Sequence, residues 1–121
     1  MSTETTVIEN ISINFRENVP AGQGVRVTQN FHYAGKIKQV LFHFPPGCAG
    51  LVRVRLLKDE KPFYPIQGYL ALDNSTPAFP MDEDYYSFEP LTLEIENTDA
   101  SFPHTISCVV AIEYKRSEPL G

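Results

Sequence analysis

Strict alternation of apolar and polar residues is the feature that most constrains the fold of this chain. In LVRVRLL, valine and leucine alternate with Arg53 and Arg55, and in LTLEIEN apolar residues alternate with polar ones that include Glu94 and Glu96. Successive side chains of a β-strand leave opposite faces of a sheet, so this pattern predicts half-buried strands. The segment ISCVVAIEY, at residues 106–114, is apolar on much of both faces, which favours a central strand.

Weaker alternation and the turn-forming residues bring the count to about eight strands. We expect strands at residues 5–15, 24–33, 36–44, 51–57, 62–72, 76–81, 91–97 and 106–114. Loops rich in Pro, Gly, Asn, Asp and Ser separate them, at residues 20–24, 45–50, 73–77, 81–90 and 97–104. The ten prolines fall at loop-like positions, and no segment has a 3.6-residue apolar period with caps. The chain is therefore expected to be all-β.

Eight strands of this spacing predict a two-sheet antiparallel sandwich with jelly-roll topology. In that topology the fourth and seventh strands are neighbours, which places Arg53 and Arg55 opposite Glu94 and Glu96. We expect each exposed pair to contribute about 0.2–1 kcal/mol. The eighth strand lies between the first and the third, which suits its apolar faces. An immunoglobulin-like sandwich is the alternative, although it usually has fewer strands and the chain has no Trp for the Cys, Trp, Cys arrangement of antibody domains.

The length of 121 residues fits a single domain, residues 1–121, whose ends at about residues 1–4 and 117–121 are expected to be flexible. The predicted core between the sheets includes Val54, Leu93, Val110 and Ile112. Replacing any one of these with Ala is expected to cost about 2–4 kcal/mol, through lost burial and a residual cavity.

The N-terminal residues MSTETTVIEN show no basic segment followed by an apolar run. No stretch approaches the roughly 20 apolar residues that a membrane helix needs. We therefore expect no signal peptide and no membrane partner. The expected location is the virion if a virus encodes the chain, and the cytoplasm otherwise.

Charge argues against nucleic acid and suggests a partner of another kind. The formal net charge is −5 and the pI about 5.1, whereas phosphate binding needs a basic surface. Between Lys61 and Lys115 there is no Lys or Arg, while nine Asp and Glu residues lie there. We predict that the acidic segment of one copy approaches the basic half of another, in a homo-oligomer that is most simply a trimer.

Catalytic and metal-binding signatures are not found in the sequence. His32, His43 and His104 stand in no recognisable local motif, and Cys48 is expected to be a small buried residue at the rim of the sandwich. Cys48 and Cys108 are too few for a disulfide framework, although a single bridge stays open. The prediction is a protein that is not an enzyme and has no cofactor and no structural metal.

Binding of sugar or a cation is the alternative function. The loops LDNSTP, MDEDYY and ENTDAS carry the carboxylate and amide oxygens that Ca²⁺ prefers. Tyrosines in or beside these loops are candidate platforms for carbohydrate, although each can instead bury its ring at a sheet edge. The candidate binding residues lie in these loops or in the segment before them: Tyr64, Tyr69, Tyr85, Tyr86, Asp82 and Asp84.

Three segments, IKQVLFHFPPGCAGLVRVRLL, GYLALDNSTP and PHTISCVVAIEY, resemble small jelly-roll proteins of tailed phages and archaeal viruses. These include modules that decorate capsids or build fibres, and the similarity spans roughly residues 31–115. The shared motifs are structural, so no functional residue follows from them. The resemblance implies a non-enzymatic structural module that assembles with itself, as a trimer or a larger ring, and binds the surface of other structural proteins.

Overall fold

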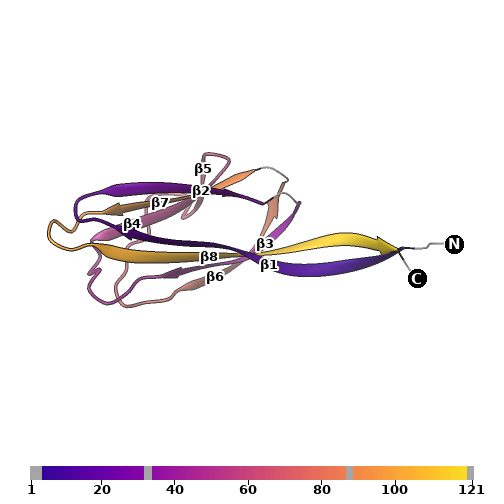
Figure 1. Ribbon diagram of the computed structural model, residues 1–121, viewed down its shortest axis with the longest axis horizontal. Helices are drawn as coiled ribbons and strands as arrows, with labels where there is room; N and C mark the ends of the chain where they lie inside the picture. Colours follow the sequence, from indigo (N-terminus) through magenta and orange to yellow (C-terminus); the bar gives the residue numbers. More distant parts are fainter. Residues whose placement is uncertain (1–3, 32–33, 87–88, 120–121) are drawn as a thin grey trace.

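The computed structural model describes residues 4–31, 34–86 and 89–119. In this part of the chain the structure is all-β, with eight strands in two antiparallel sheets of four and no helix (Figure 1). The strands are β1 (Glu4–Val19), β2 (Gly24–Asn30), β3 (Gly35–His43), β4 (Val52–Lys58), β5 (Lys61–Tyr64), β6 (Ala78–Tyr85), β7 (Pro90–Asn97) and β8 (His104–Pro119). Within the described residues, no helix is long and apolar enough to cross a membrane.

The order of the strands agrees with the two neighbour relationships that the assumed wiring predicted and that charge and apolarity suited. One sheet has the order β1-β8-β3-β6, so β8 lies between β1 and β3, and the other has the order β2-β7-β4-β5. Since β4 and β7 are neighbours, Arg53 pairs in register with Glu96 and Arg55 with Glu94. Both predictions are confirmed.

The core lies between the two sheets and is built by the alternating apolar rows. In β8, Ile106, Cys108, Val110 and Ile112 face inward and are buried. The predicted core residues are confirmed, because each is at most 1% exposed: Val54, Leu93, Val110 and Ile112. Full burial of an aliphatic side chain of this size stabilises the fold by about 1.5–3 kcal/mol.

Several expected boundaries are wrong: β1 and β8 extend beyond the expected residues 5–15 and 106–114, and two other segments differ in kind. The strand expected at residues 62–72 is limited to β5, because Pro65 has no N–H with which to continue the ladder, and the chain returns to β4 only through a bridge between Leu70 and Val54. Residues 81–90 were expected to be a loop, yet β6 continues through the acidic run to Tyr85. That run stays extended because it pairs with β3, whose lysines offset its charge.

The longest strands, β1 and β8, form one unbroken antiparallel ladder from Glu4 and Pro119 to Val19 and His104. On its other side β8 pairs with β3 only from Ser107 to Glu113. The remaining part, residues 4–9 and 114–119, is a two-stranded ribbon that extends beyond the sandwich and carries both ends of the chain (Figure 1). We call this part the ribbon.

The expected flexibility of the chain ends stays a prediction. Residues 1–3 and 120–121 lie outside the described residues. Glu4 and residues 117–119 are within the β1–β8 ladder.

Candidate interaction surfaces

The tyrosines predicted to bind a ligand do not gather at one site. Tyr85 is 1% exposed, its hydroxyl donates to the carbonyl oxygen of Glu89, and the backbone N–H of Phe31 donates to that hydroxyl at 3.1 Å. Burial raises the pKa of Tyr85. The buried Tyr85 side chain therefore links the β2–β3 loop to the β6–β7 loop through hydrogen bonds. Tyr86 is exposed, and its backbone N–H is bound by the Glu89 carboxylate at 2.7 Å.

Tyr64 also has a structural role. Its ring packs against Phe79 with a centroid distance of 4.4 Å and against Phe42 at 6.2 Å. Burial raises the pKa of Tyr64, which is the effect expected when a phenol loses contact with water. Its face is therefore taken up by packing between the sheets.

Tyr69 lies over the outer face of the β2-β7-β4-β5 sheet. The guanidinium groups of Arg53 and Arg55 stand 5.2 and 4.9 Å from its ring centroid, a cation–π arrangement. The Tyr69 hydroxyl donates to Glu94 Oε1 at 3.1 Å, and Arg26 Nε approaches the same carboxylate at 3.4 Å. This ring therefore covers a charge network of its own chain.

The two predicted aspartates lie on β6 and are paired with lysines of β3. Asp82 accepts hydrogen bonds from Lys38 Nζ at 2.7 Å and from Lys36 Nζ at 3.2 Å. These contacts, the one with Lys38 first, lower the pKa of Asp82. Asp84 is 3.5 Å from Lys36 Nζ. Their oxygens are thus engaged by ammonium groups, and no group of three His, Cys, Asp or Glu suited to a metal occurs among the described residues.

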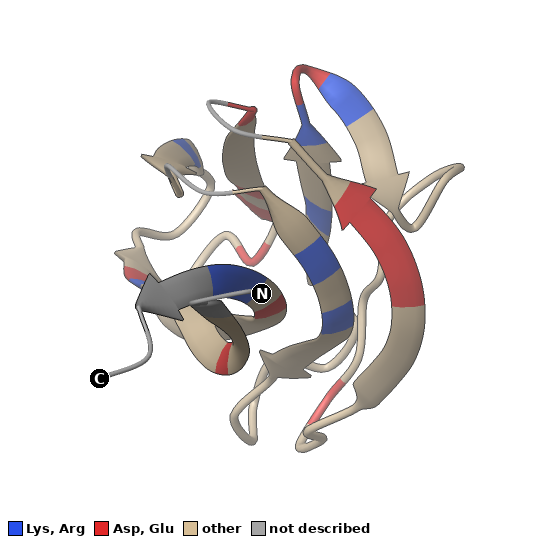
Figure 2. Ribbon diagram, turned by 90° about the vertical axis from the view of Figure 1, so that its right-hand side faces the viewer, with Lys and Arg blue, Asp and Glu red and all other residues tan. Residues whose placement is uncertain are grey.

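The segregation of charge along the sequence is not kept in the folded chain, which removes the observation behind the predicted patches, and the contact between copies stays a prediction. Acidic residues of the second half pair with basic residues of the first, as in Arg55–Glu94 at 3.0 Å and Lys58–Glu83 at 3.0 Å. Figure 2 shows acidic and basic bands on neighbouring strands. The prediction of an oligomer does not depend on charge patches, because apolar and backbone contacts also drive assembly.

The opposite end of the sandwich from the ribbon is held together by Asn97, a residue that sequence analysis did not single out. Asn97 is 1% exposed and its amide donates to the carbonyl oxygens of Val19, Pro20 and Phe102 at 3.1, 3.3 and 3.0 Å. One side chain therefore ties the β1–β2 turn to the β7–β8 loop. The only signal in the sequence is the polar stretch ENTDAS.

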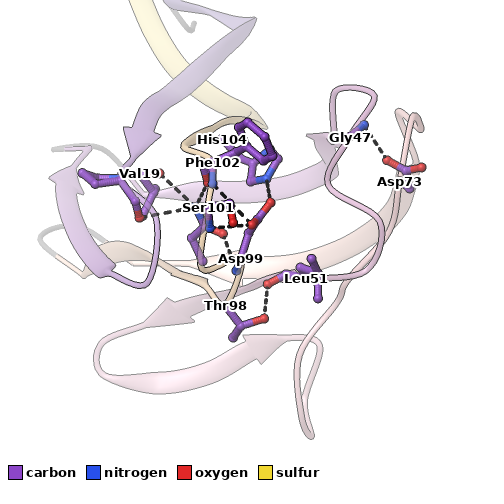
Figure 3. A network of polar contacts seen from close by, with 11 residues as sticks. Val19, Gly47, Leu51, Asp73, Thr98, Asp99, Ser101, Phe102 and His104 are labelled. Carbon is purple, nitrogen blue, oxygen red and sulfur yellow. Dashed lines mark hydrogen bonds and ion pairs between the residues drawn. The ribbon is translucent and has the colours of Figure 1, made fainter.

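Asp99 and His104 complete this polar network (Figure 3). His104 Nε2 and Asp99 Oδ2 are 2.8 Å apart, with both side chains largely buried. Asp99 Oδ1 accepts from the backbone N–H groups of Ser101 at 2.9 Å and Phe102 at 3.3 Å. The contact with His104 is the largest cause that lowers the pKa of Asp99, followed by the bond from Ser101. The Asp99 carboxylate thus fixes the conformation of the β7–β8 loop.

This rigid loop end displays apolar side chains to solvent. Phe102 is 65% exposed and Leu51 is 41% exposed, and both lie in segments that the network fixes. Thr98 anchors the second segment, because its backbone N–H and its hydroxyl both bind the carbonyl oxygen of Leu51, at 2.8 and 2.6 Å. We call these segments, residues 44–51 and 98–103, the loop end.

The remaining residues considered for chemistry are not assembled into a site. His43 lies apart, with its Nδ1 2.7 Å from the Thr76 hydroxyl, and His32 lies outside the described residues. Cys48 and Cys108 are both buried and free, so the disulfide left open by the sequence is not formed. Burial raises the pKa of both thiols, that of Cys108 to about 12.

The ribbon is the third distinctive surface. Its outer face carries Ile8, which is 56% exposed, and its other face carries Glu9, which accepts from the Tyr114 hydroxyl at 2.8 Å and binds Arg116. These contacts lower the pKa of Glu9, the Tyr114 bond most. An isolated two-stranded ribbon is at best marginally stable in water. Contacts with another chain would therefore stabilise the ribbon.

Comparison with known proteins adds little to these observations. No family model and no curated protein matches the sequence. Among solved structures, a crystal structure of FLHE is similar at a TM-score of 0.47 and 16% sequence identity, over 93% of this chain and 98% of that chain.

Proposed function

We propose that this protein is a non-enzymatic structural module that assembles with copies of itself and binds the surface of another protein, as a virion decoration or fibre component does. The observation that carries the proposal is the ribbon. It holds about a third of each of the two longest strands beyond the part of β8 that pairs with β3, and Ile8 there is 56% exposed. Its edges offer backbone donors and acceptors to another chain.

We infer that the sandwich is a jelly roll. The strand orders β1-β8-β3-β6 and β2-β7-β4-β5 support this, since they follow from folding a chain of four antiparallel strand pairs, 1 with 8, 2 with 7, 3 with 6 and 4 with 5, into two sheets. Such sandwiches serve as building blocks of capsids and also of lectin domains, so the topology alone does not choose a function.

The loop end supports the second half of the proposal, binding to a protein surface. Exposed aromatic side chains are enriched at the centres of protein interfaces, and Phe102 lies on a loop that Asn97 and Asp99 hold in place. A loop that is already ordered loses little conformational entropy on binding. Carbohydrate or cation binding through residues 73–104 stands second, because the rings of Tyr64, Tyr69 and Tyr85 and the carboxylate of Asp82 already have partners in the chain.

Light scattering after size exclusion tests the proposal on the full chain. The expected result is a mass of two or more whole chains of 13.6 kDa each at micromolar concentration. We expect this mass to persist at high salt, because the acidic residues pair within the chain and apolar and backbone contacts are screened little. A mass of one chain at every concentration and ionic strength contradicts the proposal.

A further inference from the structure

We infer that the assembling surface is the free edge of β1, and that its occupant is β1 of a second copy of this chain, paired antiparallel about Ile8. The inference rests on the proposed self-assembly and names its site, its register and its symmetry. It also replaces the trimer expected from the sequence with a dimer, because two identical edges related by a two-fold axis satisfy each other and leave no third position.

The direction of the backbone groups of β1 follows from one hydrogen bond. Gln29 of β2 donates through Nε2 to the carbonyl oxygen of Asn14 at 2.7 Å, so the Asn14 carbonyl points away from β8. The β1–β8 register has no shift along its length. In an antiparallel strand the N–H and C=O of one residue point the same way and alternate along the chain. Even-numbered residues such as Ile8 therefore direct both groups to the free edge.

The same hydrogen bond sets the length of the free edge. At Asn14 the edge is covered by Gln29, while from Glu4 to Ser12 no strand among the described residues pairs with this edge as β1 continues into the ribbon (Figure 1). The midpoint of this stretch is Ile8. A two-fold axis at Ile8 thus uses all nine residues and leaves the contact with Gln29 intact.

The β1 edge lacks the protection that the edges formed by β6, β5 and β2 have, and the edge that β8 leaves unpaired in the ribbon carries Lys115, Arg116, Glu118 and Pro119. The β6 strand carries Pro80 and an acidic run, β5 has only four residues with Pro62 among them, and β2 carries Arg26 next to its central residue. Proline, charge and shortness are the usual means by which proteins prevent edge pairing. From residue 5 to residue 15, β1 has no Pro, Gly or Lys and a single charged side chain. Its composition favours pairing with another strand.

Charge favours the register centred on Ile8 over the adjacent register centred on Glu9. A register centred on Glu9 places the two Glu9 side chains directly opposite each other, which is destabilising. Centring on Ile8 places Glu9 opposite Val7 of the second copy. Arg116 pairs with Val7 in the β1–β8 ladder, so the second copy's Arg116 is then two strands from Glu9 on the same face, about 10 Å across. In this register the two exposed Ile8 side chains also meet and bury each other.

Cysteine cross-linking of the full chain tests the register. Across this axis the two Ile8 residues form a hydrogen-bonded pair with a Cα distance of about 5.5 Å, within the range that a disulfide spans. We expect Ile8→Cys to give a cross-linked dimer under mild oxidation. The native cysteines are buried and contribute no background. Thr6→Cys and Asn10→Cys are matched controls: each alone is expected not to cross-link, since its copies stand about 13 Å apart along the strand, whereas a mixture of the two does.

A proline substitution tests the edge independently. The Ile8 N–H faces away from β8, so Ile8→Pro removes no bond of the β1–β8 ladder and is expected to leave the fold intact by circular dichroism. It removes two symmetric hydrogen bonds of the dimer, and we expect dimerisation to weaken at least tenfold. Ile8→Thr, which keeps the N–H and the β-propensity, is expected to weaken it less.

The outcomes separate this inference from the proposed function. If the chain is oligomeric by light scattering, but Ile8→Cys stays uncross-linked or Ile8→Pro keeps the full mass, the β1 edge is not the interface and the structural-module proposal still stands. Cross-linking of Thr6→Cys with itself overturns the register. A monomer at all concentrations removes both.

Discussion

Arg55 on β4 and Glu94 on β7 lie directly opposite each other, with Arg55 Nη2 3.0 Å from Glu94 Oε1 and Tyr69 covering the pair. Their side chains are 26% and 19% exposed, whereas those of the equivalent pair one step along, Arg53 and Glu96, are 41% and 46% exposed. The Arg–Glu pairing predicted from the sequence is therefore present twice, and the two pairs differ in their exposure to water.

This difference predicts unequal coupling. In double-mutant cycles with Ala, we expect about 1 kcal/mol between Arg55 and Glu94, and about 0.3 kcal/mol between Arg53 and Glu96, where water screens the charges. Urea denaturation of the four variants in each cycle measures the two values. Equal coupling in both cycles contradicts the expected dependence of the coupling on exposure to water.

Leu93→Ala tests the core. Leu93 is completely buried between the sheets, so we expect the free energy of unfolding to fall by about 2–4 kcal/mol through lost burial and a cavity. Leu51→Ala is the matched control, because Leu51 is 41% exposed and its loss is expected to cost well under about 1 kcal/mol. Chemical denaturation of both variants checks the ratio, and similar losses contradict the packing described.

Asn97→Ala is expected to destabilise the loop end more than its size suggests. It leaves the carbonyl oxygens of Val19 and Phe102 without their amide donor in a buried place, which costs about 1–3 kcal/mol. Asn14→Ala, at an exposed position, is the control. Amide hydrogen exchange should rise in the β1–β2 turn and the β7–β8 loop of the Asn97 variant. Unchanged exchange there means that other contacts hold the loops.

Acid should weaken the fold partly through Asp99. Its pKa in the folded chain is below the unfolded value, so its stabilising contribution is present above the unfolded pKa of about 4 and is lost as pH falls through the folded pKa. We expect the stability of the wild type to fall more steeply than that of Asp99→Asn as the pH is lowered below about 5. Glu9 and Asp82 shift in the same direction in both proteins, so the difference reports Asp99. Parallel curves contradict the prediction.

Neither cysteine should react in the folded protein. Both thiols are fully buried, and burial raises the pKa of Cys108 to about 12, so little thiolate forms at neutral pH. We expect a thiol reagent to label both only at the rate at which the chain unfolds. Rapid labelling of one thiol under native conditions reveals local opening at that cysteine.

Alternation predicted the strands that pack against the core, because there the pattern is imposed by burial on one face. It placed β4 and β7 to within one residue, found the core part of β8 but not its extension to Pro119, and gave the Arg–Glu register once a topology was assumed. It failed at residues 62–72, where a proline ends a short edge strand, and at the acidic end of β6, where charge was taken as a loop signal although Lys36 neutralises it. Local sequence does not show such partners in distant strands.

The candidate surfaces were harder to predict for the same reason. Tyr64 and Tyr85 were candidates for ligand platforms or for rings buried at a sheet edge, and the partners that decide this, Phe79 and Phe31, lie in other segments of the chain. Asn97 is one polar residue among many until the fold brings three carbonyl oxygens to it. The ribbon depends on how far β1 and β8 extend past β3, which is a property of their mutual register.

The β1–β8 ladder joins the first described strand to the last. During synthesis β1 leaves the ribosome well before its partner exists, and every other strand must be made in the interval. Closing so long a loop carries a large entropic cost, so we expect slow folding in which this sheet is completed late. Until the sheet is complete, both edges of β1 are unpaired. Chaperones, or fast completion of the last folding steps, must then prevent the nascent chain from aggregating.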